Sequence, residues 1–254
     1  MPALFADAAQ VREDLASLAQ WMRTDHIRLV GGEPLTSPNI ADIITAVQVS
    51  GLSGRSRIIT NGLALLNQPS GFWEAISEVH VSVYPNTRRF HDRHRDTIIA
   101  LARASGTALV YKTFDYFRKS FRPVSEDADL TEAIYRTCQI ANRWRCLTVE
   151  RGYIYRCPQS ALPTMASQTS RESDRLRLAD IESQAMLRDW ITSPAPLEAC
   201  QGCAGSVGEL HPHRQLRRDE SSSMAGGIDA GYLAELVGEP DAPNGCVVLE
   251  EVLV

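Results

Sequence analysis

Hydrophobic positions in the first half of the chain follow two alternating periods. Over residues 7–23, apolar side chains recur at intervals of three and four, the spacing of one face of an amphipathic helix. A short apolar run, residues 26–30, follows and ends at Gly31-Gly32, which predicts a strand and a tight loop. Strands that alternate with helices indicate parallel βα units, so we expect an α/β fold with a curved or closed sheet. The same order repeats, with further helices expected at 38–50, near Trp73 and at 89–105, and further strands at 57–60, 79–84 and 107–114.

The pattern changes after Pro123. A helix is expected over residues 130–144, and two short alternating runs, 146–150 and 153–157, flank Arg151-Gly152 as a β-hairpin. Another helical segment is expected at 176–190, and residues 221–227 have the composition of a flexible loop. These features predict two domains: residues 1–125, and a small α+β domain with its tail at residues 126–254.

Composition narrows the classes of partner. The chain has 26 Lys and Arg, 31 Asp and Glu and a net charge of −5, and its basic residues are scattered, so we expect no nucleic-acid partner. No stretch approaches the roughly 20 apolar residues of a membrane span, and the first residues lack a signal-peptide core. We therefore expect a cytoplasmic protein with a small-molecule or peptide partner. In that reducing compartment the six cysteines are expected to be thiols or metal ligands rather than disulfides.

Three short motifs follow predicted strands. Gly31-Gly32-Glu33-Pro34 follows the first, Thr60-Asn61-Gly62 the second, and Ser82 lies near the end of the third. Two glycines allow a ligand to approach the backbone, and a carboxylate can accept hydrogen bonds from an ammonium group. The alternative for the first motif is a βα turn with a capping acid. Because the carboxyl ends of parallel strands meet at one edge, we expect the three motifs to line one cleft.

The three motifs, in this order, resemble those of the radical S-adenosylmethionine (radical SAM) superfamily. The resemblance implies a partial (β/α) barrel in residues 1–125. In that family the first motif holds the amino group of S-adenosylmethionine, and the serine faces its ribose or carboxylate. The cofactor-binding residues that it implies are Gly31, Gly32, Glu33, Pro34, Thr60, Asn61 and Ser82.

The cysteines supply a second signal. A CxxC pair such as Cys200-Gln201-Gly202-Cys203 fits zinc, redox chemistry or cluster ligation. Upstream, Cys138 is followed by thirteen residues, then Gly152, four residues and Cys157. This spacing resembles the twitch and SPASM domains of radical SAM enzymes. It implies an auxiliary [4Fe-4S] cluster in a twitch-like domain. The implied ligands are Cys138, Cys157, Cys200 and Cys203.

Other assignments remain open. Cys146 is an alternative to Cys138, although the family pattern favours Cys138 with Trp144 as a packing residue. We expect Cys146 to be a buried small side chain and Cys246 a free or structural thiol. A zinc site could combine the CxxC pair with His211 and His213. His91 and His94 lie on an arginine-rich helix, where we expect a solvated face.

The chain departs from the family pattern in one respect. Radical SAM enzymes carry CxxxCxxC upstream of the Gly-Gly-Glu-Pro motif, whereas no cysteine precedes Cys138 here. We expect the first strand and cluster loop to be missing, through a misplaced start, truncation or natural loss. With that segment, the resemblance implies radical modification of a small metabolite or peptide, fed by an electron donor. Without it, the alternative is a non-catalytic module that binds one cluster or transfers electrons. The sequence identifies no catalytic residue.

Overall fold

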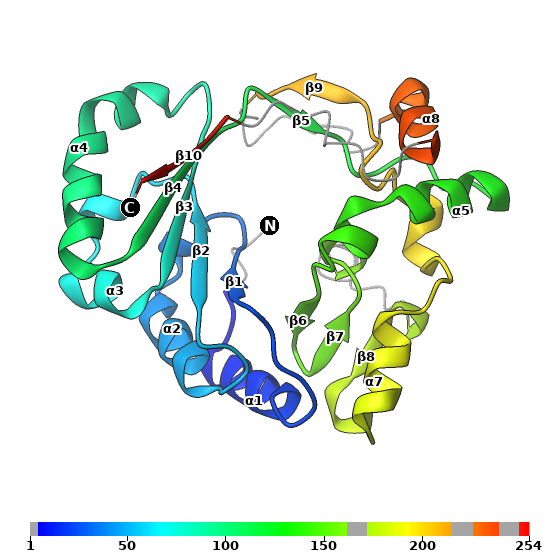
Figure 1. Ribbon diagram of the computed structural model, residues 1–254, viewed down its shortest axis with the longest axis horizontal. Coiled ribbons are helices and arrows are strands. Elements are labelled where there is room, and N and C mark those ends of the chain that lie inside the picture. The colour runs from blue at the N-terminus through cyan, green and yellow to red at the C-terminus, as the bar shows by residue number, and fades with distance from the viewer. Residues whose placement is uncertain (1–4, 162–171, 215–225, 239–248, 254) are drawn as a thin grey trace. The chain divides into compact units, whose positions relative to one another are not determined.

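A computed structural model describes residues 5–161, 172–214, 226–238 and 249–253. The chain forms two compact units (Figure 1). Unit 1 comprises Met1–Asp115 with Val248–Val254, and unit 2 comprises Tyr116–Val247. The sequence-based division was placed at residue 125, whereas the units divide after Asp115. The reason is β5 (Tyr116–Arg118), which pairs with β9 (Leu210–Pro212) of unit 2.

Unit 1 is built on one sheet with the strand order β1-β2-β3-β4-β10. The first four strands are parallel and follow chain order, and β10 joins β4 in the antiparallel sense. These four parallel strands confirm the α/β class expected from the alternating pattern. The strands are β1 (Ile27–Leu29), β2 (Ser56–Thr60), β3 (Glu78–Val83), β4 (Ala108–Thr113) and β10 (Leu249–Leu253).

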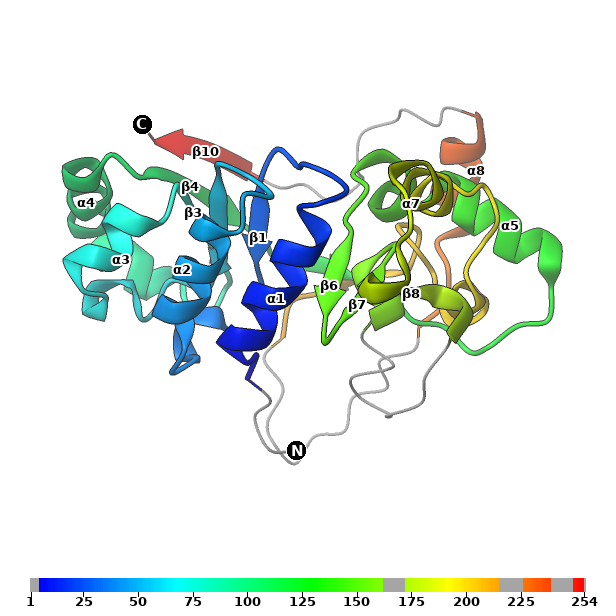
Figure 2. The ribbon, with the colours of Figure 1, turned by 90° about the horizontal axis from the view of Figure 1, so that it is seen from below.

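Helices connect the parallel strands and form the core on one face of the sheet. Right-handed crossovers between strands in chain order place successive helices on the same face. Figures 1 and 2 show α2, α3 and α4 along that face, where Trp73 and Ile98 pack against Ile58, Val79 and other strand residues. The helices of unit 1 are α1 (Ala8–Leu18), α2 (Ile40–Val49), α3 (Ser70–Ala75) and α4 (Arg88–Ser105), with short 3-10 turns η1 (Pro34–Thr36) and η2 (Leu65–Asn67).

Unit 2 has small sheets and short helices. Its three-stranded sheet, β6-β7-β8, contains the predicted hairpin: β6 and β7 are antiparallel around Arg151 and Gly152, both at positive φ (49° and 81°), as a two-residue turn requires. Apart from β5 and β9, the elements are β6 (Thr148–Glu150), β7 (Tyr153–Tyr155), β8 (Arg175–Arg177), α5 (Ala128–Thr137), α7 (Gln184–Ile191), α8 (Ala230–Gly238), the π-helical turn η3 (Gln139–Arg143), and 3-10 turns η4 (Glu172–Asp174), η5 (Leu178–Asp180) and η6 (Glu198–Gly202).

One predicted element of unit 2 is partly wrong. The helix expected at residues 176–190 begins instead with strand β8, in which Leu176 pairs with Ile154. Helix α7 starts only after Ser183, whose hydroxyl accepts a hydrogen bond from the Met186 N–H and caps the helix. Most of the loop predicted at residues 221–227 lies outside the described residues. No helix in the described part of the chain is both long and apolar enough to cross a membrane.

Candidate functional site

Four cysteines from three separate segments of unit 2 line one cavity. Cys138 ends α5 in an extended conformation, immediately before η3. Cys157 follows β7, and Cys200 and Cys203 belong to η6 and its C-cap. The cavity is small, and its other lining residues are mainly apolar. The fold of unit 2 therefore gathers the four predicted ligands around one space.

Burial favours the neutral thiol at Cys157, Cys200 and Cys203 when no metal is bound. Cys157 and Cys203 are each only 9% exposed. Loss of hydration raises the pKa of Cys157, and raises the pKa of both Cys200 and Cys203 to about 12; the neighbouring thiols add smaller contributions in the same direction. A bound metal takes up thiolates, so loading this site releases protons.

Two backbone features that the sequence analysis missed shape the cavity. Gly205 has φ +53°, and a Cβ added there would lie 3.4 Å from Cys138 Sγ and 3.1 Å from Ile134 Cγ2. Its N–H also donates a hydrogen bond of 3.2 Å to Cys203 Sγ. A glycine two positions after the CxxC pair was the available signal.

Asp174 holds the loop that carries the CxxC pair. Its side chain is 1% exposed, and its two oxygens accept hydrogen bonds from the N–H groups of Glu198 (2.7 Å) and Ala199 (2.8 Å). These N–H groups lie in the first turn of η6, where no intrahelical acceptor exists for them. Asp174 thus fixes the backbone just before Cys200. Its separation of more than twenty residues from the CxxC pair left no local signal in the sequence.

Two buried arginines place positive charge near the cysteines. Arg122 Nε donates to the Cys203 carbonyl (3.2 Å), and its Nη2 donates to Thr131 Oγ1. Arg156 Nη1 donates to the hydroxyl of Tyr135, which lines the cavity. Arg122 and Arg156 are 9% and 8% exposed. Both guanidinium groups therefore contact residues that line the cavity.

The number and type of donors at the cavity are those that a [4Fe-4S] cluster requires. A [4Fe-4S] cubane binds each of four thiolates at a different iron, so its ligands surround a volume rather than a point. The four cysteines that line this one cavity supply the required number of sulfur donors. Among the described residues, no three His, Cys, Asp or Glu side chains form a group that could hold a metal ion, so cluster binding by these cysteines stays a prediction.

The alternative ligands lie elsewhere. Cys146 is half-buried and is not among the residues that line the cavity. Trp144, expected as a packing residue, is 47% exposed because it follows the turn η3 at the surface, so that prediction is wrong. His211 lies on β9, near Glu209 and the ring of Phe117, and does not line the cavity either. His213 likewise lies near that ring, and Cys246 falls outside the described residues.

In unit 1, a carboxylate ties together two of the predicted cofactor loops. Glu33 Oε1 accepts hydrogen bonds from Thr60 Oγ1 (2.6 Å) and the Leu35 N–H (3.1 Å), and Oε2 accepts one from the Asn61 N–H (2.7 Å). Glu33 also caps η1, which begins at Pro34. The acid therefore acts both as the capping residue of the alternative interpretation and as a link between the ends of β1 and β2.

His91 packs against the loop Thr60-Asn61-Gly62, whereas a position on a solvated helix face was expected. It is 3% exposed, and its Nε2 lies 2.9 Å from the Asn61 carbonyl oxygen. Gly62 has φ +76°, and a Cβ there would approach His91 Cε1 to 2.7 Å. The prediction was wrong because His91 falls on the face of α4 that packs against the sheet, next to Tyr111. Burial is the main cause that lowers the pKa of His91.

The remaining predicted cofactor residues differ in their surroundings. A Cβ at Gly31 or Gly32 would meet nothing within 4 Å, so a ligand has room to approach this backbone. Ser82 is 6% exposed and lies one position after Val81, the register partner of Thr60. Successive strand residues point to opposite faces, so the Ser82 hydroxyl and the Thr60 hydroxyl project from different faces of the sheet.

Comparisons with known proteins add no assignment. The sequence matches no protein-family model, and no curated protein gives a significant match.

Proposed function

We propose that this is a radical SAM-like protein whose unit 2 holds a [4Fe-4S] cluster on Cys138, Cys157, Cys200 and Cys203. The observation that carries the proposal is the cavity lined by all four cysteines. Four thiolates complete the coordination of one cubane, and a cluster so bound accepts or donates single electrons.

The surrounding residues would orient and stabilise the ligands. The Gly205 N–H is already directed at Cys203 Sγ, and a hydrogen bond to a ligating sulfur raises the reduction potential of a cluster. Asp174 fixes the backbone before Cys200, and Arg122 and Arg156 offset negative charge. The cavity wall of Ile134, Ile140 and Leu197 limits contact with water.

For unit 1 we propose a site for S-adenosylmethionine at the ends of β1, β2 and β3. The open space beside Gly31 and Gly32 supports backbone recognition of the amino group. Glu33 has its carboxylate occupied by Thr60, Asn61 and Leu35, so its proposed role is to position the loops. The substrate would be a small metabolite or peptide, and an external electron donor would be required.

The number and positions of the cysteines favour a second candidate function, a module that binds one cluster or transfers electrons. Reductive cleavage of S-adenosylmethionine in the radical SAM family uses a second cluster with three cysteine ligands. Residues 1–137 contain no cysteine, and four of the six cysteines are assigned to the proposed cluster in unit 2. The proposal for this chain alone is therefore cluster binding, and radical chemistry is proposed only where three further thiolates are provided.

Anaerobic reconstitution with iron and sulfide tests the cluster. About four irons and four sulfides per chain, with broad visible absorption, are expected for the wild type and for Cys146→Ser. Replacement of Cys138, Cys157, Cys200 or Cys203 by Ser is expected to abolish stable loading. A colourless protein that binds one zinc, or a Cys146→Ser variant that loses iron, would contradict the assignment. Formation of 5′-deoxyadenosine under a strong reductant separates the two candidates, because only the enzyme produces it.

A further inference from the structure

The two buried arginines of unit 2, Arg122 and Arg156, contact only neutral groups among the described residues. They are 9% and 8% exposed. Arg122 Nε donates a hydrogen bond to the Cys203 carbonyl oxygen at 3.2 Å, and its Nη2 donates to Thr131 Oγ1 at 3.1 Å. A carbonyl and a hydroxyl satisfy N–H groups but do not neutralise a positive charge. In the described part of the chain, Arg122 therefore carries a buried charge without an ion pair.

Arg156 is bonded in the same way. Its Nη1 donates to the Ser193 carbonyl oxygen (2.8 Å) and to the Tyr135 hydroxyl (3.3 Å), and its Nη2 donates to the Ala195 carbonyl oxygen (2.9 Å). Its Nε is buried and has no hydrogen-bond partner among the described residues. The guanidinium also lies 5.9 Å from the centre of the Tyr135 ring. These dipoles and the ring reduce the cost of burial but supply no negative charge.

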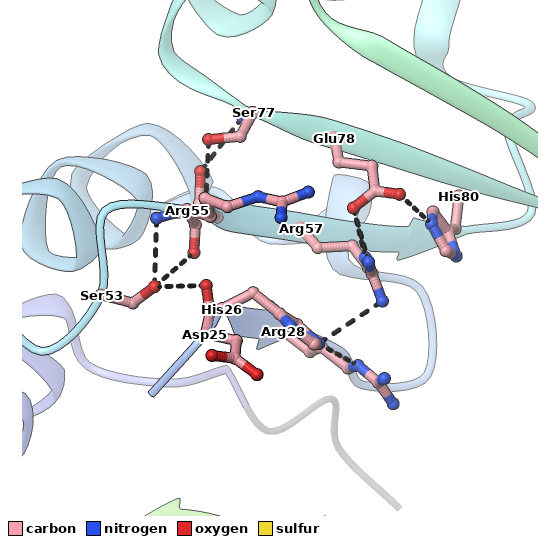
Figure 3. A network of polar contacts seen from close by, with 10 residues as sticks. Asp25, His26, Arg28, Ser53, Arg55, Arg57, Ser77, Glu78 and His80 are labelled. Atoms are coloured by element: carbon pink, nitrogen blue, oxygen red, sulfur yellow. Dashed lines mark hydrogen bonds and ion pairs between the residues drawn. The ribbon is translucent and has the colours of Figure 1, made fainter. Parts of the chain in front are cut away.

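Arginines that are less buried in the same chain are paired with acids. In unit 1, Arg57 donates from Nε and Nη2 to Glu78 Oε2 at 2.7 and 2.6 Å (Figure 3). In unit 2, Arg118 Nη1 lies 3.1 Å from Asp229 Oδ2. Arg57 and Arg118 are half-buried. The two most buried arginines of the described chain thus lack the carboxylate that their less buried counterparts have.

Both buried arginines adjoin the cavity lined by the four cysteines. Arg122 is bonded to the carbonyl of Cys203, and Arg156 directly precedes Cys157 in the chain. The Tyr135 hydroxyl that accepts from Arg156 belongs to a residue that lines the cavity. Burial raises the pKa of Tyr135, while Arg156 lowers it and three of the cavity cysteines raise it. This hydroxyl therefore lies within electrostatic range of Arg156 and of the cysteines.

Positive charge at this place has a consequence for an iron–sulfur cluster. Buried charges in proteins are normally paired or associated with a metal centre. A [4Fe-4S] cluster on four thiolates is an anion, and its one-electron reduction adds a negative charge without forming or breaking a bond. Because Coulomb interactions are stronger in a protein interior than in water, a nearby guanidinium group stabilises the reduced form more than the oxidised form. Its presence therefore raises the reduction potential.

We propose that Arg122 and Arg156 are the countercharges of the cluster in unit 2 and raise its reduction potential. The electron comes from the external one-electron donor, which is oxidised as the cluster is reduced. The inference rests on the proposed function, because it assumes the cluster on the four cysteines. It adds a role for two residues that act through their charge, as positioning residues do, and not as ligands.

Reduction potentials of the reconstituted full chain, measured by anaerobic spectroelectrochemical titration, test the inference. For Arg122→Gln and Arg156→Gln we expect the equilibrium constant for reduction to fall at least about tenfold, which lowers the potential by about 59 mV. Arg122→Lys and Arg156→Lys keep the charge and are expected to keep a potential close to that of the wild type. Arg188→Gln, at an exposed position of α7, is the control and is expected to leave the potential unchanged.

The Lys variants separate charge from hydrogen bonding. Equal lowering of the potential by Gln and Lys at both positions would overturn the inference, and so would Gln variants that match Arg188→Gln. Arg156→Gln leaves the bond of Arg122 to the Cys203 carbonyl intact, so it tests charge even where Arg122→Gln does not load iron. Loading by both Lys variants but by neither Gln variant would also support the role of charge. Failure of all four variants to load would make the arginines structural and overturn it.

The wild type separates this inference from the proposed function. A wild-type protein that takes up no cluster contradicts the proposed function itself. A loaded wild type whose potential equals those of both Gln variants contradicts only the role of Arg122 and Arg156.

Discussion

Gly205→Ala is expected to weaken the proposed cluster binding, because it places one methyl group against Cys138. The residue has φ +53°, where an L-residue costs about 1–2 kcal/mol relative to glycine. The new Cβ would also lie 3.4 Å from Cys138 Sγ and 3.1 Å from Ile134 Cγ2, so these atoms must move by a few tenths of an ångström. Metal–ligand distances tolerate only about 0.2 Å. We therefore expect cluster affinity to fall about 10–100-fold.

Gly152→Ala is the matched control. Gly152 also lies in unit 2 with positive φ, +81°, but a Cβ there meets nothing within 4 Å. Both variants are expected to lose about 1–2 kcal/mol of unfolding free energy in the metal-free protein, measured by chemical denaturation. Only Gly205→Ala should also lose visible absorption rapidly when the reconstituted protein meets an iron chelator. Equal rates of loss in the two variants would refute the view that the close approach of Gly205 to Cys138 shapes the cluster site.

Three further predictions concern buried hydrogen bonds. Asp174→Asn is expected to speed iron loss to a chelator, whereas exposed Asp180→Asn is not; equal rates would contradict the anchoring role. Glu33→Gln is expected to lower unfolding free energy by about 1–3 kcal/mol, and exposed Glu74→Gln by far less, in denaturant titrations. Because burial lowers the folded-state pKa of His91, the unfolded chain binds a proton first; stability should fall as pH drops below about 6.5, and less steeply in His91→Asn.

Local pattern was sufficient for much of the fold. The alternation at β3 and the turn pair Arg151-Gly152 each specify an element within a few residues, and both elements are present. The pairing of β5 with β9 was missed because it joins residues 116–118 to 210–212, and short strands of this kind carry no periodicity of their own. The strand β8 was taken as helix because three residues are too few to distinguish the two periods.

For the candidate site, the four cysteines could be predicted from the sequence, whereas the residues that position them could not. Cysteine spacing pointed to four thiols that line one cavity in the structure, and their binding of a cluster stays a prediction. The role of Asp174 was not predictable from local pattern. Its carboxylate accepts hydrogen bonds from two backbone N–H groups more than twenty residues away, and nothing near Asp174 in the chain distinguishes it from a surface acid. A solvent-exposed His91 was expected because arginines surround it along the chain. In the structure, the His91 ring packs so close to Gly62 that a Cβ added at Gly62 would clash with it.

The short first strand also bears on self-association. In the described sheet, β1 is the terminal strand of the order β1-β2-β3-β4-β10 and has only three residues, a length of about 10 Å. An incoming strand would gain few backbone hydrogen bonds there, and it would bring its side chains beside the charged Arg28. Short, charged edges of this kind are how natural sheets resist edge-to-edge aggregation. Arg28 at this short edge thus discourages the pairing of β1 with a strand of another molecule.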